Sequence, residues 1–263
     1  MTRQALLALD TSTDYCSVAL LTFEAAGSAT HQLLVRHELT GIRSSARLLP
    51  AARELFDAAG LPPTACVAIG FGVGPGSFTG LRTATGVAQG LAFALGIPVV
   101  PVGTLLACAE AARHDALTDG AAGLPSQYVL SVLDARMDEV YWAEFAWQDA
   151  TASWQVVGAP AVCAPEAVPA PSGPFVLVGN ALAVYGERLA AARHAMAQWP
   201  SAPHAGAIAR LALPIWLAGG GLPPALAAPL YIRDKVALTT AERAARQLAA
   251  SAVGDAPAGA GVQ

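Results

Sequence analysis

Hydrophobic and polar positions follow two different periods in the first part of the chain. Two short apolar runs between Ala5 and Phe23 flank the polar turn Asp10-Thr11-Ser12-Thr13-Asp14, which is typical of a β-hairpin. Residues Ser44 to Ala59 instead carry apolar side chains at helical spacing, so we predict a helix that Ser44 or Ser45 caps and Gly60 ends. A second helix is predicted over Thr79–Leu95.

The hairpin pattern occurs twice. Leu9-Asp10-x-x-x-Asp14 recurs as Leu133-Asp134-x-x-x-Asp138, and each copy runs on into an apolar strand, Cys16–Leu21 and Val140–Phe145. After a helical stretch, each hairpin is followed by a hydrophobic strand that ends in glycine, Cys66–Gly70 and Pro174–Gly179. Strand pairs that alternate with helices predict an α/β fold in which a mixed sheet covered by helices is duplicated in two lobes, with a cleft between them.

We divide the chain into three parts on this pattern. Residues 1–103 form the predicted N-terminal lobe, with the first hairpin, a glycine-rich loop and both helices, and residues 104–236 form the C-terminal lobe. The segment from Gly158 to Pro174 is rich in Pro and Ala, which predicts a linking loop. Residues 237–263 are an Ala- and Gly-rich tail with too little apolar bulk to pack, and we expect most of it to be disordered.

The composition is unusually apolar, with 54% hydrophobic and 13% charged residues. The longest uncharged run, Thr83 to Ala109, is long enough to cross a bilayer, but Pro98 and Pro101 break any helix after Gly96. This run therefore predicts a buried helix followed by a strand, and no membrane partner. The N-terminus reaches Asp10 too early for a signal peptide, so we expect a cytoplasmic protein.

Charge and cysteine spacing restrict the possible partners and compartments. The formal net charge is −4, whereas a broad nucleic-acid-binding surface needs clustered Lys and Arg. If the protein works on RNA, a partner must hold most of the RNA. The four cysteines are far apart and form no C-x-x-C pair, so we expect reduced thiols in the core.

The stretch from Gly70 to Arg82, GFGVGPGSFTGLR, leaves a strand and enters a helix. Glycine permits close backbone approach, and helix N-terminal amides carry partial positive charge, so the stretch is a candidate nucleotide- or anion-binding loop. It lacks the Lys of a Walker loop and the third glycine of G-x-G-x-x-G, and a structural tight turn is the alternative. The candidate binding residues are Asp10, Thr11, Gly74, Gly76, Ser77, Thr79 and Arg82.

Small residues line the second predicted helix at intervals of four. Gly80, Ala84, Ala88 and Ala92 form one line, and Gly86, Gly90 and Ala94 form another. Small residues at this spacing let a second helix approach closely, either inside the fold or at an interface between two chains. For the interface we predict the residues Leu48, Leu49, Ala52, Leu55, Phe56, Gly80, Leu81, Ala84 and Ala88.

The usual catalytic signatures are missing from the sequence. His31, His37, His114, His194 and His204 form no H-x-x-x-H or H-E-x-x-H pair, and there is no G-x-S-x-G elbow. We therefore predict no metal ligands, no catalytic residues, no required cofactor and no activity of the chain alone. The best carboxylate candidates are the turn residues Asp10, Asp14, Asp134 and Asp138, for which ordinary turn chemistry is the alternative.

Four segments carry a family resemblance: LALDTSTDYCSVAL, GFGVGPGSFTGLRTATGVAQGLA, LDARMDEVYWAEF and PLYIRDKVA. With them the chain resembles the TsaB family, also called YeaZ, over nearly its whole length before the tail. The resemblance implies a two-lobed actin-like ATPase fold (ASKHA, ribonuclease H-like). It also implies a subunit that binds and activates the paralogue TsaD, which transfers threonylcarbamoyl to N6 of the adenosine beside the tRNA anticodon.

The resemblance further implies that TsaD holds the metal and uses H-x-x-x-H, where this chain has Thr104 and Cys108. ATP and the metal are then expected in partner subunits, and the partners are TsaD, TsaE, tRNA through the complex, and a second copy of the chain through the two N-lobe helices. This chain departs from the family pattern at two positions. It has Ser44 where the family has a histidine, and Asp138 where a glycine is common. The competing hypothesis is a stand-alone metallopeptidase or small-molecule kinase of the same fold, which rests on fold analogy alone.

Overall fold

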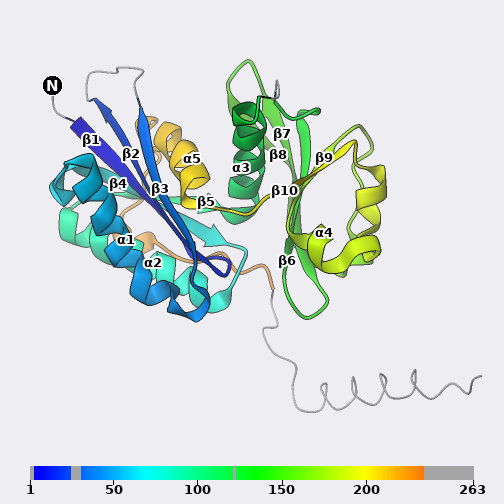
Figure 1. The fold of residues 1–263 in the computed structure, drawn as a ribbon, viewed down its shortest axis with the longest axis horizontal. Helices are drawn as coiled ribbons and strands as arrows, with labels where there is room; N and C mark the ends of the chain where they lie inside the picture. Colours follow the sequence, from blue (N-terminus) through cyan, green and yellow to red (C-terminus); the bar gives the residue numbers. More distant parts are fainter. Residues whose placement is uncertain (1–2, 25–30, 121–122, 234–263) are drawn as a thin grey trace, which may run out of the picture. The chain divides into compact units, whose positions relative to one another are not determined.

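The computed structural model describes residues 3–24, 31–120 and 123–233 (Figure 1). Residues up to Ile232 form one compact unit, and Arg233 is the only described residue of a second unit. The predicted tail, residues 237–263, lies outside the described residues. Within the described ranges, no helix combines the length and the apolar character that crossing a bilayer requires.

The first sheet contains the predicted hairpin at its centre. Its strand order is β3-β2-β1-β4-β5, in which β1, β2 and β3 pair antiparallel while β4 and β5 extend the sheet parallel to β1. The hairpin turn therefore lies at the carboxyl end of the central strand. The bounds are β1 Arg3–Asp10, β2 Tyr15–Glu24, β3 Gln32–Leu39, β4 Cys66–Gly74 and β5 Val99–Gly103.

The second sheet repeats this arrangement. Its strand order is β10-β9-β6-β7-β8, with β6, β7 and β8 antiparallel and β9 and β10 parallel to β6. Read from β8, each strand occupies the place of its counterpart in the first sheet, so the predicted duplicated α/β fold is confirmed. The bounds are β6 Tyr128–Asp134, β7 Val140–Gln148, β8 Ser153–Cys163, β9 Val176–Gly179 and β10 Ala197–Pro200.

The second copy differs from the sequence prediction between β8 and β9. The linking loop predicted from Gly158 to Pro174 is wrong up to Cys163, because β8 runs to that residue. Pro160 suggested a loop, but it lies in an edge strand, where the pairing with β7 shifts register, and such positions tolerate proline. Between β8 and β9 the described chain forms only the 3-10 turn η3 (Pro165–Ala167), so the predicted helical stretch of this copy is also wrong.

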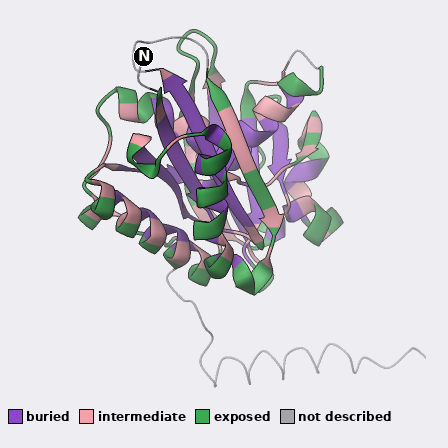
Figure 2. Cartoon of the chain, turned by 60° about the vertical axis from the view of Figure 1, so that its left-hand side comes forward, coloured by how far each residue is buried: buried purple, intermediate pink, exposed green. Residues whose placement is uncertain are grey.

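Helices cover both faces of the first sheet. Because strand side chains alternate, Leu7 and Leu9 of β1 pack with α1 and α2, while Leu6 and Ala8 pack with α5 on the other face. Figure 1 shows this layering, and Figure 2 shows buried strands between helices with exposed outer sides. The helix bounds are α1 Ser44–Ala59, α2 Phe78–Leu95, α3 Thr104–Thr118, α4 Ala181–Tyr185 and α5 Ala205–Leu217.

The two sheets do not divide the sequence at one point. The lobe boundary predicted at residues 103 and 104 coincides with the junction of β5 and α3, and α3 packs on the second sheet. However, α5 belongs by sequence to the predicted C-terminal lobe and packs on the first sheet. The first sheet therefore recruits a helix from beyond the second sheet in the sequence.

Local signals placed the ends of α1 and α2 almost correctly. Gly60 ends α1 in the left-handed conformation, with φ 64°, as predicted. The cap of α1 is Arg43 and not Ser44 or Ser45, because a 3-10 turn leads directly into the helix and the Ser44 hydroxyl donates to the Gly41 carbonyl at 2.8 Å. Helix α2 begins one residue before the prediction, with Ser77 as its cap.

Candidate functional site

The carboxyl end of β1 places Asp10 in the interior. Its Oδ2 accepts hydrogen bonds from the Ser12 hydroxyl at 2.9 Å and the Ser12 amide at 3.3 Å, while its Oδ1 has no partner among the described residues. Burial raises the pKa of Asp10 to about 7, although the Ser12 hydrogen bonds act in the opposite direction. Asp10 is therefore a buried carboxyl group with one unused oxygen.

The hairpin turn and the start of α2 are in direct backbone contact. The Ser77 amide donates to the Ser12 carbonyl at 2.8 Å, and the Thr11 hydroxyl donates to the Gly80 carbonyl at 2.6 Å. A Cβ at Gly76 or Gly80 would collide with the carbonyl oxygen of Ser12 or Thr11, respectively. Both glycines thus permit close packing between the turn and the helix. This role agrees with the alternative interpretation of the glycine-rich stretch as a structural tight turn.

The predicted glycine-rich loop is largely a strand. Because β4 continues to Gly74, the glycines at 70, 72 and 74 belong to the sheet, and only Pro75-Gly76-Ser77 connects it to α2. A Cβ at Gly72 would collide with the Asp10 carboxylate, and one at Gly70 with Ala212 of α5. Gly70 and Gly72 are two residues apart and point to the same face of β4, so close packing on that face requires residues without side chains.

The structure brings together only part of the predicted binding set. Asp10, Thr11, Gly76 and Ser77 are neighbours at the hairpin turn, whereas the Arg82 guanidinium lies on the Phe78 ring. Gly74 has φ 120° and lies against the Leu230 carbonyl, and Thr79 is exposed. Nucleotide or anion binding here stays a prediction.

Most of the predicted interface residues are packed inside the chain. Leu49 is the exception, with an exposed fraction of 49%, and Gly80 is half-buried against Thr11. Helical spacing cannot distinguish a stripe that faces the protein's own sheet from one that faces a partner. The residues buried in the core of this chain are Leu48, Ala52, Leu55, Phe56, Leu81, Ala84 and Ala88.

The exposed side of these helices carries the second line of small residues instead. A Cβ at Gly86 or Gly90 would meet no atom of residues 3–24, 31–120 or 123–233 within 4 Å, and Phe93 on the same helix is 82% exposed. Helix α1 contacts α2 and exposes Leu49. We call Leu49, Gly86, Gly90 and Phe93 the outer face. The spacing of Gly86, Gly90 and Ala94 was the signal in the sequence that indicated it.

The turns of the two hairpins meet. Arg136 donates to the Asp14 carboxylate at 3.2 Å, and its backbone amide donates to Asp134 Oδ1 at 2.8 Å. Arg136, Met137 and Asp138 all have positive φ, at 60°, 58° and 61°, so the second turn is left-handed over three consecutive residues. Asp138 pairs with Arg188 at 3.2 Å. These carboxylates thus shape and join the two turns.

The positions that the family resemblance aligned with a metal-binding histidine pair are buried at the start of α3. The Thr104 hydroxyl donates to the Pro75 carbonyl. Burial raises the pKa of the Cys108 thiol to about 11. Among the described residues, no three or more His, Cys, Asp or Glu side chains gather closely enough to hold a metal ion.

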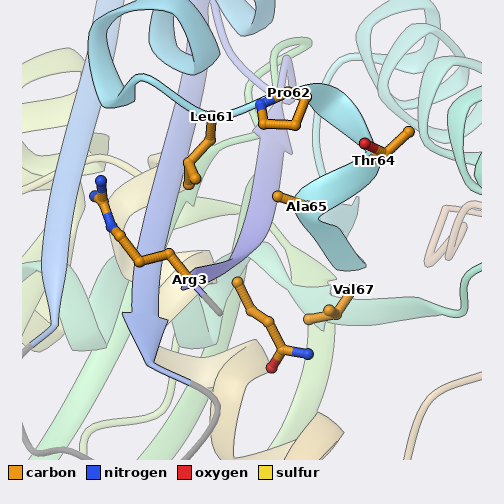
Figure 3. Close-up of a pocket in the computed structure, with 7 residues that line it drawn as sticks. Arg3, Leu61, Pro62, Thr64, Ala65 and Val67 are labelled. Carbon is orange, nitrogen blue, oxygen red and sulfur yellow. The ribbon is translucent and has the colours of Figure 1, made fainter. Parts of the chain in front are cut away.

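Two surface pockets lie away from the first hairpin turn, Asp10 to Asp14. One, of about 580 Å³, lies at the amino ends of β1 and β4, and Arg3, Leu61 and Val67 are among the residues that line it (Figure 3). The other, of about 370 Å³, lies at the carboxyl ends of β9 and β10, beside Asn180 and Trp199. The first is at the opposite end of β1 from Asp10, so it is separate from the predicted binding residues.

Comparison with known proteins identifies relatives over most of the chain. Residues 35–251 match the family model of TsaD, tRNA N6-adenosine threonylcarbamoyltransferase. The chain is 38% identical over 174 residues to the tRNA threonylcarbamoyladenosine biosynthesis protein TsaB of Haemophilus influenzae, covering 63% of this chain and 66% of that protein. It is 37% identical over 180 residues to TsaB of Escherichia coli, covering 66% and 71%.

The fold has a solved counterpart. YeaZ from Pseudomonas aeruginosa superposes with a TM-score of 0.74 at 37% sequence identity, over 87% of this chain and 99% of that one. The aligned segments span about two thirds of the two curated relatives, whereas the structural match spans nearly all of its counterpart.

Proposed function

The chain belongs to the TsaB family, also called YeaZ, whose curated members are named for tRNA threonylcarbamoyladenosine biosynthesis, and we propose that it is the non-catalytic subunit that binds and activates TsaD. In this role it requires no cofactor, and ATP and the metal are bound by the partner subunits. TsaE and tRNA join through the complex, in the cytoplasm.

The observation that carries the proposal is the pair of exposed glycines on α2. A glycine inside a helix costs about 0.5–1 kcal/mol relative to alanine. Among the described residues, neither Gly86 nor Gly90 has a neighbour that a methyl group would strike, so no packing within this part of the chain requires glycine there. A helix of another protein that approaches the outer face closely supplies the missing reason.

The exposed apolar side chains beside these glycines support the same face. Phe93 and Leu49 extend from neighbouring helices, and exposed aromatic side chains often anchor protein interfaces. The outer face thus replaces the buried residues of the sequence prediction as the proposed TsaD-binding surface. A second copy of the chain fits the same surface, so a homodimer would compete with TsaD for it.

Co-purification with tagged TsaD tests the proposal. Phe93→Glu and Gly90→Arg place a charge on the outer face and should abolish capture by TsaD without lowering the melting temperature. Val157→Glu is the matched control, because Val157 is an exposed apolar residue on β8 and its substitution should leave capture unchanged. Normal capture of both outer-face variants would refute this surface.

A bulky charge at Ala88 would be uninformative, because Ala88 is buried in the core and its substitution would disturb the fold itself.

A further inference from the structure

An arginine stacked on aromatic rings stands at the start of α2, apart from the outer face. The Arg82 guanidinium carbon lies 3.5 Å from the centroid of the Phe78 ring and 5.7 Å from that of Tyr231. The centroids of the two rings are 5.3 Å apart. Phe78 and Tyr231 are still 37% and 45% exposed, so the stack forms a surface platform.

Backbone hydrogen bonds hold the two halves of this platform together. The Leu230 amide donates to the Val73 carbonyl at 2.7 Å, which ties the residue before Tyr231 to β4. On the other side, the Ser77 side chain caps α2 directly before Phe78. The Gln89 side chain also donates to the Pro224 carbonyl at 3.2 Å, which fastens the segment that leads to Tyr231 along α2. Contacts within the chain therefore hold the platform in a preformed arrangement.

The donors of Arg82 are unused within the described part of the chain. Arg47 and Arg113 hydrogen-bond to carboxylates, whereas Arg82 has no ion pair and no side-chain hydrogen bond with any described residue. A separation of 3.5 Å is van der Waals contact, so one side of the guanidinium lies on the Phe78 ring. Its opposite side and its N–H edge remain available to a planar, anionic ligand.

We propose that this platform binds single-stranded RNA directly. A nucleobase stacks on the side of the Arg82 guanidinium that faces away from Phe78, while the N–H edge of the guanidinium donates to the adjacent phosphate. The formal charge of −4 excludes a broad electrostatic surface, so local stacking must supply most of the affinity. If the bound RNA is tRNA, that identity rests on the proposed function. The stacking itself requires no partner protein and does not depend on the proposed function.

Fluorescence anisotropy with the purified full chain, without TsaD, tests the proposal. The probes are labelled oligoadenylate and oligouridylate, with inorganic tripolyphosphate as competitor. Loss of one stacked base costs about 1–3 kcal/mol, so Arg82→Ala should weaken oligoadenylate binding by about 5- to 150-fold. Arg82→Lys keeps the charge but not the planar group, and Phe78→Leu keeps apolar bulk but not the ring, so both should also weaken binding.

Arg193→Ala is the charge-matched control, because Arg193 is exposed in the 3-10 turn Ala190–His194 and lies far from Phe78 in the sequence. It should bind as the unaltered chain does, and melting temperatures should confirm that every variant is folded. Unchanged oligoadenylate binding by Arg82→Ala and Phe78→Leu would overturn the proposal. So would an equal affinity for both oligonucleotides together with full competition by tripolyphosphate, or a loss of TsaD capture without any loss of RNA binding.

Discussion

The Thr11 hydroxyl donates a 2.6 Å hydrogen bond to the Gly80 carbonyl, and the Thr11 carbonyl oxygen occupies the space that a Cβ at position 80 would need. The hairpin turn of the first sheet and the first turn of α2 therefore touch through their backbones. This contact explains why a glycine stands at the start of the helix.

Substitution of Gly80 by alanine should destabilise the protein. The new methyl group would strike backbone, which yields much less than a flexible side chain, so we expect the free energy of unfolding to fall by about 1–3 kcal/mol. Urea unfolding followed by circular dichroism measures this change. Gly86→Ala is the control, since its methyl group meets no atom of the described residues, and an equal loss in both variants would contradict the steric explanation.

Alanine at Gly86 and Gly90 should have opposite effects on the chain and on its complex. Each substitution removes the cost of an exposed glycine inside a helix, so the isolated chain should gain about 0.5–1 kcal/mol per site. The two methyl groups should weaken binding to TsaD, because they hold the partner helix away. Urea unfolding and titration calorimetry measure the two effects, and unaltered TsaD affinity of the double variant would argue against close approach.

The stability of the protein should respond to the titration of Asp10. Its pKa is about 7 in the folded protein and 3.8 in the unfolded chain, so between these values the folded state binds more protons. Stability due to this group is therefore present below about pH 4 and is lost as the pH rises through 7. The whole effect is up to about 4 kcal/mol.

Asp10→Asn removes this titration. The difference in unfolding free energy between the variant and the unaltered chain should grow from pH 5 to pH 8 in favour of the variant. Comparison of the two proteins cancels the contributions of other groups, such as His204, whose pKa burial lowers to about 4. A difference that is constant with pH would show that Asp10 is not a high-pKa group.

The left-handed turn at Arg136, Met137 and Asp138 should favour glycine at its last position. Both Asp138→Gly and Asp138→Ala lose the contact with Arg188, but only alanine retains a Cβ at φ 61°. We therefore expect the glycine variant to be more stable than the alanine variant by about 1–2 kcal/mol in urea unfolding. Equal stability would mean that the turn changes conformation on substitution.

Local patterns predicted the first lobe well and the second less well. The bounds of α1 followed from apolar spacing and a terminal glycine within one segment, although the predicted serine cap was wrong, and α2 begins one residue before its predicted start. In the second lobe, proline suggested a loop where β8 forms a strand. An edge strand tolerates proline because it has no neighbouring strand on one side, and the sequence does not show which strand lies at the edge.

The candidate surfaces show a similar division. The sequence identified small residues on α2 and assigned Gly80, Ala84 and Ala88 to the partner interface, whereas Ala84 and Ala88 are buried in the core of this chain. It included Arg82 in a phosphate loop, whereas the side chain stacks on Phe78 and Tyr231. Tyr231 is distant in sequence, so no local motif contains that contact.

Local sequence patterns were enough to predict the α/β class, the repeated hairpin, the family and the two N-lobe helices, because periodicity, helix-ending glycines and motifs depend on neighbouring residues. Three features became visible only in the folded chain: which side of each helix is covered, that α5 joins the first sheet, and that the glycines of β4 make room for Asp10 and α5. These features depend on which distant surfaces meet, and an apolar or small residue has the same spacing whether it meets its own sheet or another chain.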